Sequence, residues 1–350
     1  MKQHQSSAGF ICFLLPLMFL FLAGFTTTFA QEQTSVSTKL EKAIQYYNEL
    51  DFEKGLSLTK ELLQKEGLND QDSIAIYSVM SMLTYAMGTD YLRQAFQYLD
   101  KIAQIGPCKV PLPYHFWPQQ LRDQWYDLAH AQNALMCTAE TSPEIQTVAI
   151  MEFDNYSVGK YQEELGFITK GLADFFESDF AKISSLRVVE RDKIDFILKE
   201  IEMAKEGKVD ASTAVKVGKI LGAQLMVFGS IVQIDKNNTK MLCKVVKVET
   251  SEILTSVERE GKPDYFAMEK ELVMELAEKL NLALNDNTKK LIQESGTAST
   301  DAATLYAKGL YYMDQYDYKK AYEFFRMAYD MDNTFTEAKK KMDIYHPLAA

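Results

Sequence analysis

Three apolar runs follow one another in the middle of the chain: LMVFGSIVQI at residues 225–234, KMLCKVVKVE at residues 240–249 and EILTSVER at residues 252–259. Runs of this length and composition predict β-strands. The first two are joined by Lys236-Asn237-Asn238 and the last two by a tight turn near Thr250-Ser251. Because such short joints connect antiparallel neighbours, we expect an antiparallel meander of these strands.

The sequence around this meander predicts strands that alternate with helices. Alternation of this kind is typical of a parallel sheet, so the sheet as a whole should be mixed. The sequence therefore predicts an α/β domain with a mixed sheet over residues 146–286. Its other expected elements are strands over Thr147–Phe153 and Leu186–Glu190, and helices over Glu163–Lys182, Asp192–Ile201, Ala211–Leu221 and Tyr265–Leu284.

Four short motifs of this domain carry a family resemblance. They are VAIMEFDN at residues 148–155, RVVER at 187–191, GKILGA at 218–223 and VFGS at 227–230. In order and spacing they resemble the periplasmic core of the curli secretion component (CsgG) family, although Gln224 stands where the commonest family form has Asp. The resemblance implies a bacterial cell-envelope protein that takes part in assembly or secretion. Channel-type members of the family are lipoproteins that form rings with an inserted β-barrel.

This chain departs from the channel type in two respects. No Cys directly follows the apolar part of the leader, and the connections at Ile183–Ser185 and Glu206–Asp210 are too short for membrane hairpins. In the remaining hairpin, Lys244 falls on one strand face and Lys247 on the other, which leaves no clean lipid-facing side. We therefore expect no stable membrane insertion by this chain.

The first residues have the features of a secretory signal peptide. Lys2 precedes an uncharged apolar run over Phe10–Phe25, and Thr28-Phe29-Ala30 supplies the small-residue end. An uncleaved anchor helix is the alternative, but the run is shorter than the roughly 20 residues that a bilayer span needs. We predict a signal peptide over residues 1–30 and a mature protein in the periplasm of a Gram-negative bacterium, with outer-membrane association left open.

Helical periodicity dominates both flanks of the α/β domain. Residues 37–138 indicate paired helices that resemble tetratricopeptide repeats, and residues 301–345 have the spacing of one such repeat. An ordinary helical hairpin is the alternative, because it too uses small residues where its helices cross. Since such repeats are stable only when stacked, the C-terminal one must pack on another domain or another chain. The residues at repeat spacing are Leu305, Gly309, Tyr312, Ala321, Phe325 and Ala328.

Charge and cysteine content argue against several classes of protein. The formal net charge is −11, which argues against a nucleic-acid partner. Beyond the leader, Cys108, Cys137 and Cys243 have no C-x-x-C spacing, so neither a disulfide framework nor a zinc site is indicated. We expect buried free thiols, because Cys137 should end a helix that begins near Pro118, about 25 to 30 Å from its start. A bridge between Cys108 and Cys137 stays open, since export would permit it.

No residue pattern predicts catalysis, a cofactor or a metal site. Gly218-Lys219 lacks the other residues of a phosphate loop, and His115 and His130 are isolated from each other and from Cys. For Glu190-Arg191 we favour a structural ion-pairing role at the sheet edge over a catalytic acid. Asp154-Asn155 stands where open α/β sheets often bind ligands, but a turn is the interpretation that we favour.

The sequence therefore predicts a non-catalytic envelope protein that acts in assembly, secretion or scaffolding through contacts with other envelope proteins. Two alternatives stay open, a subunit of an outer-membrane secretion channel and a regulator of an envelope enzyme. Homo-oligomerisation stays open as well. Aromatic side chains dominate the energetics of protein interfaces, although packing of the helical regions is an alternative role for them here. The candidate partner contacts are Tyr114, Phe116, Trp117, Tyr312 and Tyr316.

Overall fold

A mixed sheet forms the centre of the computed structural model, which describes residues 36–135, 137, 145–200 and 211–349. The strand order is β3-β1-β4-β5-β6, and β2 pairs with β4 off this path. β1 runs parallel to β3 and β4, whereas β4, β5 and β6 are antiparallel. The predicted α/β fold with a mixed sheet is confirmed. The strands are β1 (Gln146–Ile150), β2 (Asp154–Asn155), β3 (Leu186–Val189), β4 (Leu225–Asp235), β5 (Asn238–Lys247) and β6 (Glu252–Gly261).

The meander predicted from residues 225–259 is present, and its two faces differ. On β5 the side chains of Met241, Cys243 and Val245 are buried, and the strand contacts α10 (Tyr265–Lys279). The alternate side chains of Lys240, Leu242 and Lys244 are half-buried, and the ammonium of Lys244 lies 5.4 Å from the ring centroid of Phe228. Within the described part of the chain, no helix is both long and apolar enough to cross a membrane.

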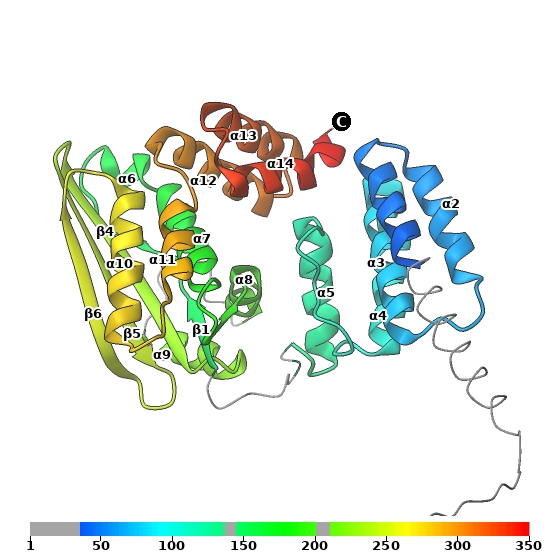
Figure 1. Ribbon diagram of the computed structural model, residues 1–350, viewed down its shortest axis with the longest axis horizontal. Helices are drawn as coiled ribbons and strands as arrows, with labels where there is room; N and C mark the ends of the chain where they lie inside the picture. The colour runs from blue at the N-terminus through cyan, green and yellow to red at the C-terminus, as the bar shows by residue number, and fades with distance from the viewer. Residues whose placement is uncertain (1–35, 136, 138–144, 201–210, 350) are drawn as a thin grey trace, which may run out of the picture.

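Helices cover the sheet in the region from β1 to α11, which we call the α/β region. α7 packs on β1, β3 and β4, and α10 packs on β5 and β6 (Figure 1). The helix expected over Glu163–Lys182 is interrupted near Gly166, and α11 was not expected. α9 is followed by Gly222 at φ 62°, which suits a helix end. The helices are α6 (Tyr161–Glu164), α7 (Ile168–Phe180), α8 (Arg191–Glu200), α9 (Ala211–Ile220), α10 (Tyr265–Lys279) and α11 (Asp286–Glu294).

The N-terminal helical segment, residues 36–135, consists of paired helices as predicted. A helix over residues 36–48 precedes α2, and the side chain of Asp51 accepts a hydrogen bond from the backbone N–H of Lys54 to cap α2. A Cβ on Gly55 of α2 would lie 2.7 Å from the Leu83 side chain of α3, so these two helices pack closely at the glycine. The other elements are α2 (Phe52–Leu63), α3 (Asp70–Ala86), the 3₁₀ turn η1 (Thr89–Tyr91), α4 (Leu92–Ile105) and α5 (Gln119–Ala131).

Cys108 and Cys137 form a disulfide, so the expectation of free thiols at these two positions was wrong. α5 ends at Ala131, and the segment that precedes it, Pro107–Pro113, lies against the C-terminal end of the same helix. The loop thus runs back along the helix, which brings the two Cα atoms to 5.1 Å. Cys243 is a buried free thiol, as expected.

The C-terminal helices are α12 (Thr300–Asp314), α13 (Tyr318–Met331) and α14 (Thr336–Ala349). α12 and α13 cross closely at Gly309, where an added Cβ would lie 2.5 Å from the ring of Phe325. This agrees with the small-residue spacing, and assignment to the tetratricopeptide family stays a prediction. The hydroxyl of Tyr306 donates to Asp174 on α7 at 2.8 Å. The neighbour on which these helices pack is therefore the α/β region of the same chain.

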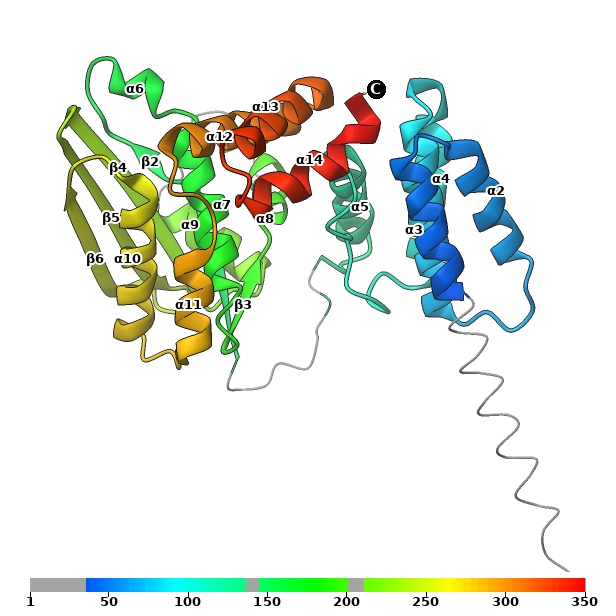
Figure 2. The same cartoon turned by 45° about the horizontal axis from the view of Figure 1, so that its top comes forward.

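α5 is the last helix of the N-terminal helical segment and lies between its other helices and the rest of the molecule, and α14 passes beside it in both views (Figures 1 and 2). The guanidinium of Arg122 donates to Glu190 at 2.8 Å and to Asp192 at 2.7 Å. The hydroxyl of Tyr316 donates to Asp123. α5 is thereby joined both to the α/β region and to the C-terminal helices.

Candidate functional site

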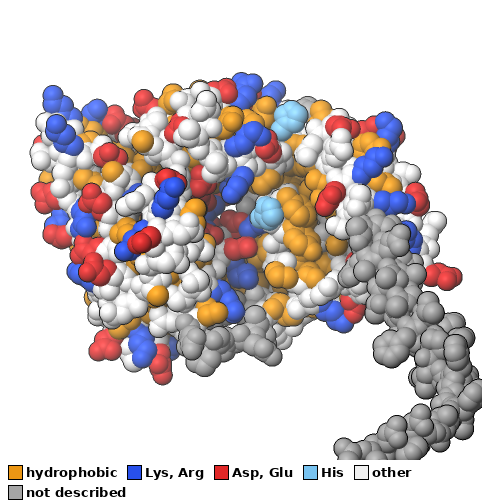
Figure 3. Space-filling view, viewed as in Figure 1, with side chains coloured by type: hydrophobic (Ala, Val, Ile, Leu, Met, Phe, Trp, Pro, Cys, Tyr) orange, Lys and Arg blue, Asp and Glu red, His pale blue; other side chains and the backbone are white. Residues whose placement is uncertain are grey.

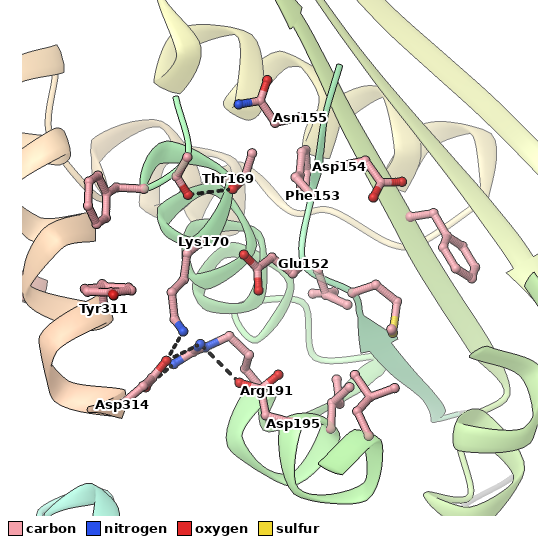
Figure 4. A pocket seen from close by; sticks show the side chains of 18 of the residues that line it. Glu152, Phe153, Asp154, Asn155, Thr169, Lys170, Arg191, Asp195, Tyr311 and Asp314 are labelled. Atoms are coloured by element: carbon pink, nitrogen blue, oxygen red, sulfur yellow. Dashed lines mark hydrogen bonds and ion pairs between the residues drawn. The ribbon is translucent and has the colours of Figure 1, made fainter. Parts of the chain in front are cut away.

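A cavity of about 700 Å³ opens at the carboxyl end of β1, and we call it the junction cavity (Figure 4). Its lining comes from β1, β2 and the connection between them, from β4, from α6, α7 and α8, from α12 and from the N-terminal part of α5. All three parts of the chain thus contribute to one site. The lining residues used below are Gln119, Asp123, Glu152, Phe153, Asp154, Phe167, Lys170, Arg191, Asp195, Phe228, Tyr311 and Asp314.

The position of the site follows from how β1 ends. After Ile150 the chain leaves the sheet and rejoins it at Asp154-Asn155, which pair with Ser230 and Ile231 of β4. This short strand, β2, replaces the turn that we favoured at Asp154-Asn155. Phe153 packs where a Cβ on Gly229 would lie 2.3 Å from its ring, so the glycine makes room for it. Carboxyl ends of parallel strands are the usual ligand sites of open α/β sheets.

Two cations of the cavity wall are held by carboxylates. Lys170 on α7 forms an ion pair with Asp314 at the end of α12. The guanidinium of Arg191 lies 3.3 Å from Asp195 and 3.5 Å from Asp314. Burial, together with the nearby charge of Arg191, lowers the pKa of Lys170 to about 8. Asp314 therefore connects the C-terminal helices to the α/β region through both cations.

Glu152 differs from these paired groups. Its side chain is exposed toward the cavity, and among the described residues it takes part in no hydrogen bond or ion pair. Figure 4 shows it facing the space onto which Lys170 and Arg191 converge. Protein surrounds the carboxyl on its other sides, and this desolvation raises the pKa of Glu152. The cavity thus contains a carboxyl group that no neighbouring side chain satisfies.

The lining combines acidic charge with aromatic surface. The rings of Phe167 and Tyr311 meet edge to face, with centroids 5.2 Å apart. Within the described ranges, no group of three or more His, Cys, Asp or Glu side chains is placed to hold a metal ion. Acids outnumber bases on the lining, where Asp123, Glu152, Asp154, Asp195 and Asp314 stand against Lys170 and Arg191.

The side chains of Glu190 and Arg191 bind different partners, although the two residues are adjacent in sequence. The carboxylate of Glu190 accepts from Arg122 at 2.8 Å and from the hydroxyl of Tyr126 at 2.9 Å. Arg191 instead faces the junction cavity. Burial alone would raise the pKa of Asp192, but the guanidinium groups of Arg122 and Arg191 lower it. The structural role predicted for the pair is present, although its partners come from α5, α8 and α12.

A second cavity of about 280 Å³ lies between α5, α7 and α14. In Figure 3, apolar side chains gather over α5 beside a hollow where acidic and basic side chains mix. The lining of the second cavity includes the acids Glu177 and Glu190 and the cations Arg122 and Lys341. Burial and the charge of Asp174 raise the pKa of Glu177 to about 8. Glu177 accepts from the backbone N–H of Arg191 at 3.1 Å, so it stabilises the start of α8.

The aromatic residues chosen from the sequence do not lie together. Trp117 is only 1% exposed and packs edge to face with Trp125. Tyr114 and Phe116 are half-buried and stack on each other at 5.0 Å. Tyr312 stacks on Phe324, and Tyr316 binds Asp123 of α5. Trp117 is therefore a packing residue, while a partner role for Tyr114, Phe116, Tyr312 and Tyr316 stays a prediction.

Sequence reasoning did not find the junction cavity as a site. Glu152 left a signal, because it is a charged residue inside the apolar run of residues 147–153. Asp314 left none. Tyr311 is one of several tyrosines of the C-terminal helices for which packing and partner contact were both open, and neither choice pointed to Glu152. Gly218-Lys219 lies in α9, where a Cβ on Gly218 would meet Met226 and Val248, so the glycine serves close packing.

The comparison with protein families covers the centre of this fold. Residues 130–242 match the family model for the curli production assembly/transport component CsgG. The CsgG match includes Glu152, Lys170, Arg191 and Asp195 of the junction cavity and ends within β5. Tyr311 and Asp314 lie outside it.

Solved structures similar to this chain each cover about two fifths of it. The C-terminal domain of LpoB from Escherichia coli is 15% identical, covering 39% of this chain and 96% of that chain at a TM-score of 0.25. Its counterpart from Salmonella enterica is 14% identical, covering 37% and 90% at 0.25. Lipoprotein GNA1162 from Neisseria meningitidis is 12% identical, covering 40% and 99% at 0.29. No curated protein matches this chain in sequence.

Proposed function

We propose that this protein is a non-catalytic cell-envelope factor that acts in assembly, secretion or scaffolding, and that its junction cavity binds a segment of a partner protein. The match of residues 130–242 to a family described as an assembly and transport component supports an envelope role. The predicted signal peptide, residues 1–30, lies outside the described residues and is consistent with a location in the cell envelope.

One observation carries the proposal: the cavity lining is shared by α5, the α/β region and α12. A segment bound there contacts parts of the chain that are otherwise connected by side-chain ion pairs and hydrogen bonds. Binding would therefore favour the arrangement in which Asp314 reaches Lys170 and Arg191. A scaffold with its partner bound would thus favour a different arrangement of its parts from a scaffold without it.

The volume and lining suit a short polypeptide segment. Ligand pockets are typically about 300–1,000 Å³ with aromatic surface and a few polar groups, and the junction cavity is about 700 Å³. Lys170 and Arg191 are held by carboxylates, so the cavity wall has a fixed charge pattern. A wall of this kind is suited to recognition, because its groups need not rearrange when a ligand enters.

Site-specific crosslinking in the native host tests the proposal. A photo-reactive residue is placed at Tyr311, which lines the cavity and is 41% exposed, or at Tyr91 in η1, which is 40% exposed and outside it. We expect an envelope protein to be captured at position 311 and not at position 91. Equal capture at both positions, or none at either, would overturn the proposal. Fractionation of the same cells should place the chain in the periplasm or at the outer membrane, cleaved after Ala30.

A further inference from the structure

We infer that the junction cavity accepts a Lys or Arg side chain of the partner segment, with Glu152 as the carboxylate that receives its charge. This inference rests on the proposed function, because it names the chemistry of the group that enters the cavity. It goes further in that it predicts which sequences can bind and which cannot.

The charge of the lining favours a cation over an anion. Lys170 and Arg191 are the basic residues of the lining, and both are already paired with carboxylates. An incoming anion would have to displace Asp314 or Asp195 from them. An incoming cation meets Glu152, which has no ion-pair partner among the described residues. An opposite charge at a partly desolvated carboxylate is stabilised more than in water.

A second, independent feature is Gln119 at the start of α5. Its side chain lines the cavity and is only 5% exposed. The amide nitrogen donates to Asp123 at 2.9 Å, which fixes the amide orientation, and the amide oxygen has no donor among the described residues. A buried acceptor without a donor costs free energy. Ammonium and guanidinium groups are donors only, so they supply what Glu152 lacks, and the Gln119 oxygen, which has almost no accessible surface, could accept from them only after its side chain turns toward the cavity.

The aromatic rings explain why the cation should be carried by a long apolar stem. Phe167, Phe228 and Tyr311 line the cavity. Lys and Arg side chains place their methylene groups along such surfaces while the charged head reaches a polar group. Rings at this rim already contact cations of the chain itself, since Lys244 lies 5.4 Å from the Phe228 centroid and Lys308 lies 5.8 Å from that of Phe167.

An organic cation fits better than a metal ion. The described residues include no group of three or more acidic, His or Cys side chains placed to hold a metal. The carboxyls of the lining are instead spread over several elements, and Asp314 and Asp195 are engaged by Arg191. A side chain with a single charge requires only one free carboxylate, and Glu152 provides it.

Binding of matched peptides to the full mature chain tests this inference. The probes are fluorescein-labelled Gly-Ser hexapeptides that differ at one central residue: Arg, Lys, the neutral Arg isostere citrulline, norleucine or Glu. Fluorescence anisotropy gives each Kd at low and at 0.3 M salt. We expect the Arg and Lys peptides to bind at least tenfold more tightly than the citrulline and norleucine peptides, with the preference reduced by salt.

Two variants locate the effect. Glu152→Gln should bring the Arg and citrulline peptides to equal affinity, and it should fold, because the Glu152 side chain is exposed and makes no side-chain bond in the described structure. Glu66→Gln removes an exposed acid of the N-terminal helical segment and should leave the preference unchanged. Equal binding of Arg and citrulline peptides by the wild type, or a preference that survives Glu152→Gln, would overturn the inference.

A competition experiment tests whether the ligand of the cavity is a polypeptide or a small amine. Ethylguanidine and n-butylamine are added as competitors at the concentration of the Arg peptide. If they displace it with equal potency, a polypeptide source is ruled out. The outcomes remain distinct from those of crosslinking: capture of an envelope protein at position 311 without any charge preference would remove this inference and leave the proposed function standing.

Discussion

The hydroxyl of Tyr318 on α13 accepts a hydrogen bond from the backbone N–H of Gln120 in the first turn of α5, at 3.0 Å. α5 begins after Pro118, which provides no side-chain cap. The first N–H groups of a helix need acceptors from elsewhere. A side chain far away in sequence therefore caps this helix, and the start of α5 depends on the C-terminal helices.

Removal of this hydroxyl should weaken the whole molecule. Tyr318→Phe leaves the Gln120 N–H without its acceptor, and the expected loss in the free energy of unfolding is about 1 kcal/mol. Urea unfolding followed by circular dichroism measures it. Tyr329→Phe on the same helix is the matched control, since no hydrogen bond of its hydroxyl is found among the described residues. Equal stability of the two variants would contradict the capping role.

Arg122 should be the most costly single charge to remove. It is 9% exposed and pairs with Glu190 and Asp192. Arg122→Met would leave Glu190 without a guanidinium and Asp192 with only that of Arg191 at 3.4 Å, at an expected cost of about 3–5 kcal/mol. Arg93→Met, an exposed position on α4, should change stability little.

The same variant has a predicted pH dependence. The pKa of Asp192 lies below its ordinary 3.8, so the stabilisation from its charge is present above that value and is lost as pH falls through the folded-state pKa. The stability gap between wild type and Arg122→Met should therefore narrow below about pH 4. A gap that widens with acid would count against this assignment.

Glu269 on α10 should oppose folding at neutral pH. Its side chain is fully buried, neither oxygen has a hydrogen bond among the described residues, and Lys270 lies 3.6 Å away. Burial, and then the charge of Asp179, raises the pKa of Glu269 well above 4.5. A raised folded-state pKa means that stability is lost as pH rises above the unfolded value, by at most about 1.4 kcal/mol per pH unit.

Glu269→Gln tests this directly. The variant should gain stability relative to the wild type as pH rises from 4 to 8, measured by urea unfolding at each pH. Glu278→Gln, an exposed acid of the same helix, is the control and should show no such gain. A constant difference between wild type and Glu269→Gln across that range would refute the prediction.

Gly309→Ala should destabilise the crossing of α12 and α13. Alanine favours a helix over glycine by about 0.5–1 kcal/mol, but its Cβ would lie 2.5 Å from the ring of Phe325. Overpacking of this kind costs about 1–3 kcal/mol, so a net loss in melting temperature is expected. Adding Phe325→Leu should recover part of the loss. Gly261→Ala, where the nearest atom is 3.5 Å away, is the comparison.

Local sequence signals predicted the sheet well and its surroundings less well. The β4–β6 meander follows from apolar runs separated by Asn237-Asn238 and Ser251, because turn residues and strand periodicity act over short distances. β2 was missed because two residues carry no periodicity. The disulfide was misjudged because α5 was expected to continue to Cys137, whereas it ends at Ala131.

Local sequence signals did not predict the candidate site. Glu152 belongs to a quoted motif, but its exposure to a cavity depends on α12 and α5, which arrive from opposite ends of the chain. Likewise, the tyrosines of the C-terminal helices could be assigned to repeat packing or to partners, and neither choice pointed to Gln120 or Asp123. Contacts of this range are set by tertiary packing, which a single sequence does not encode in its periodicity.

The bond between Cys108 and Cys137 also bears on the order in which the parts of the chain fold. An unfolded chain would offer Cys243 as a third thiol for exchange. Formation of the sheet withdraws it, because Cys243 has no exposed surface in β5 and burial raises the pKa of its thiol. We expect the α/β region to fold before the bond between Cys108 and Cys137 forms beside α5. The N-terminal helical segment would then be the last part to mature and the part most open to envelope proteases.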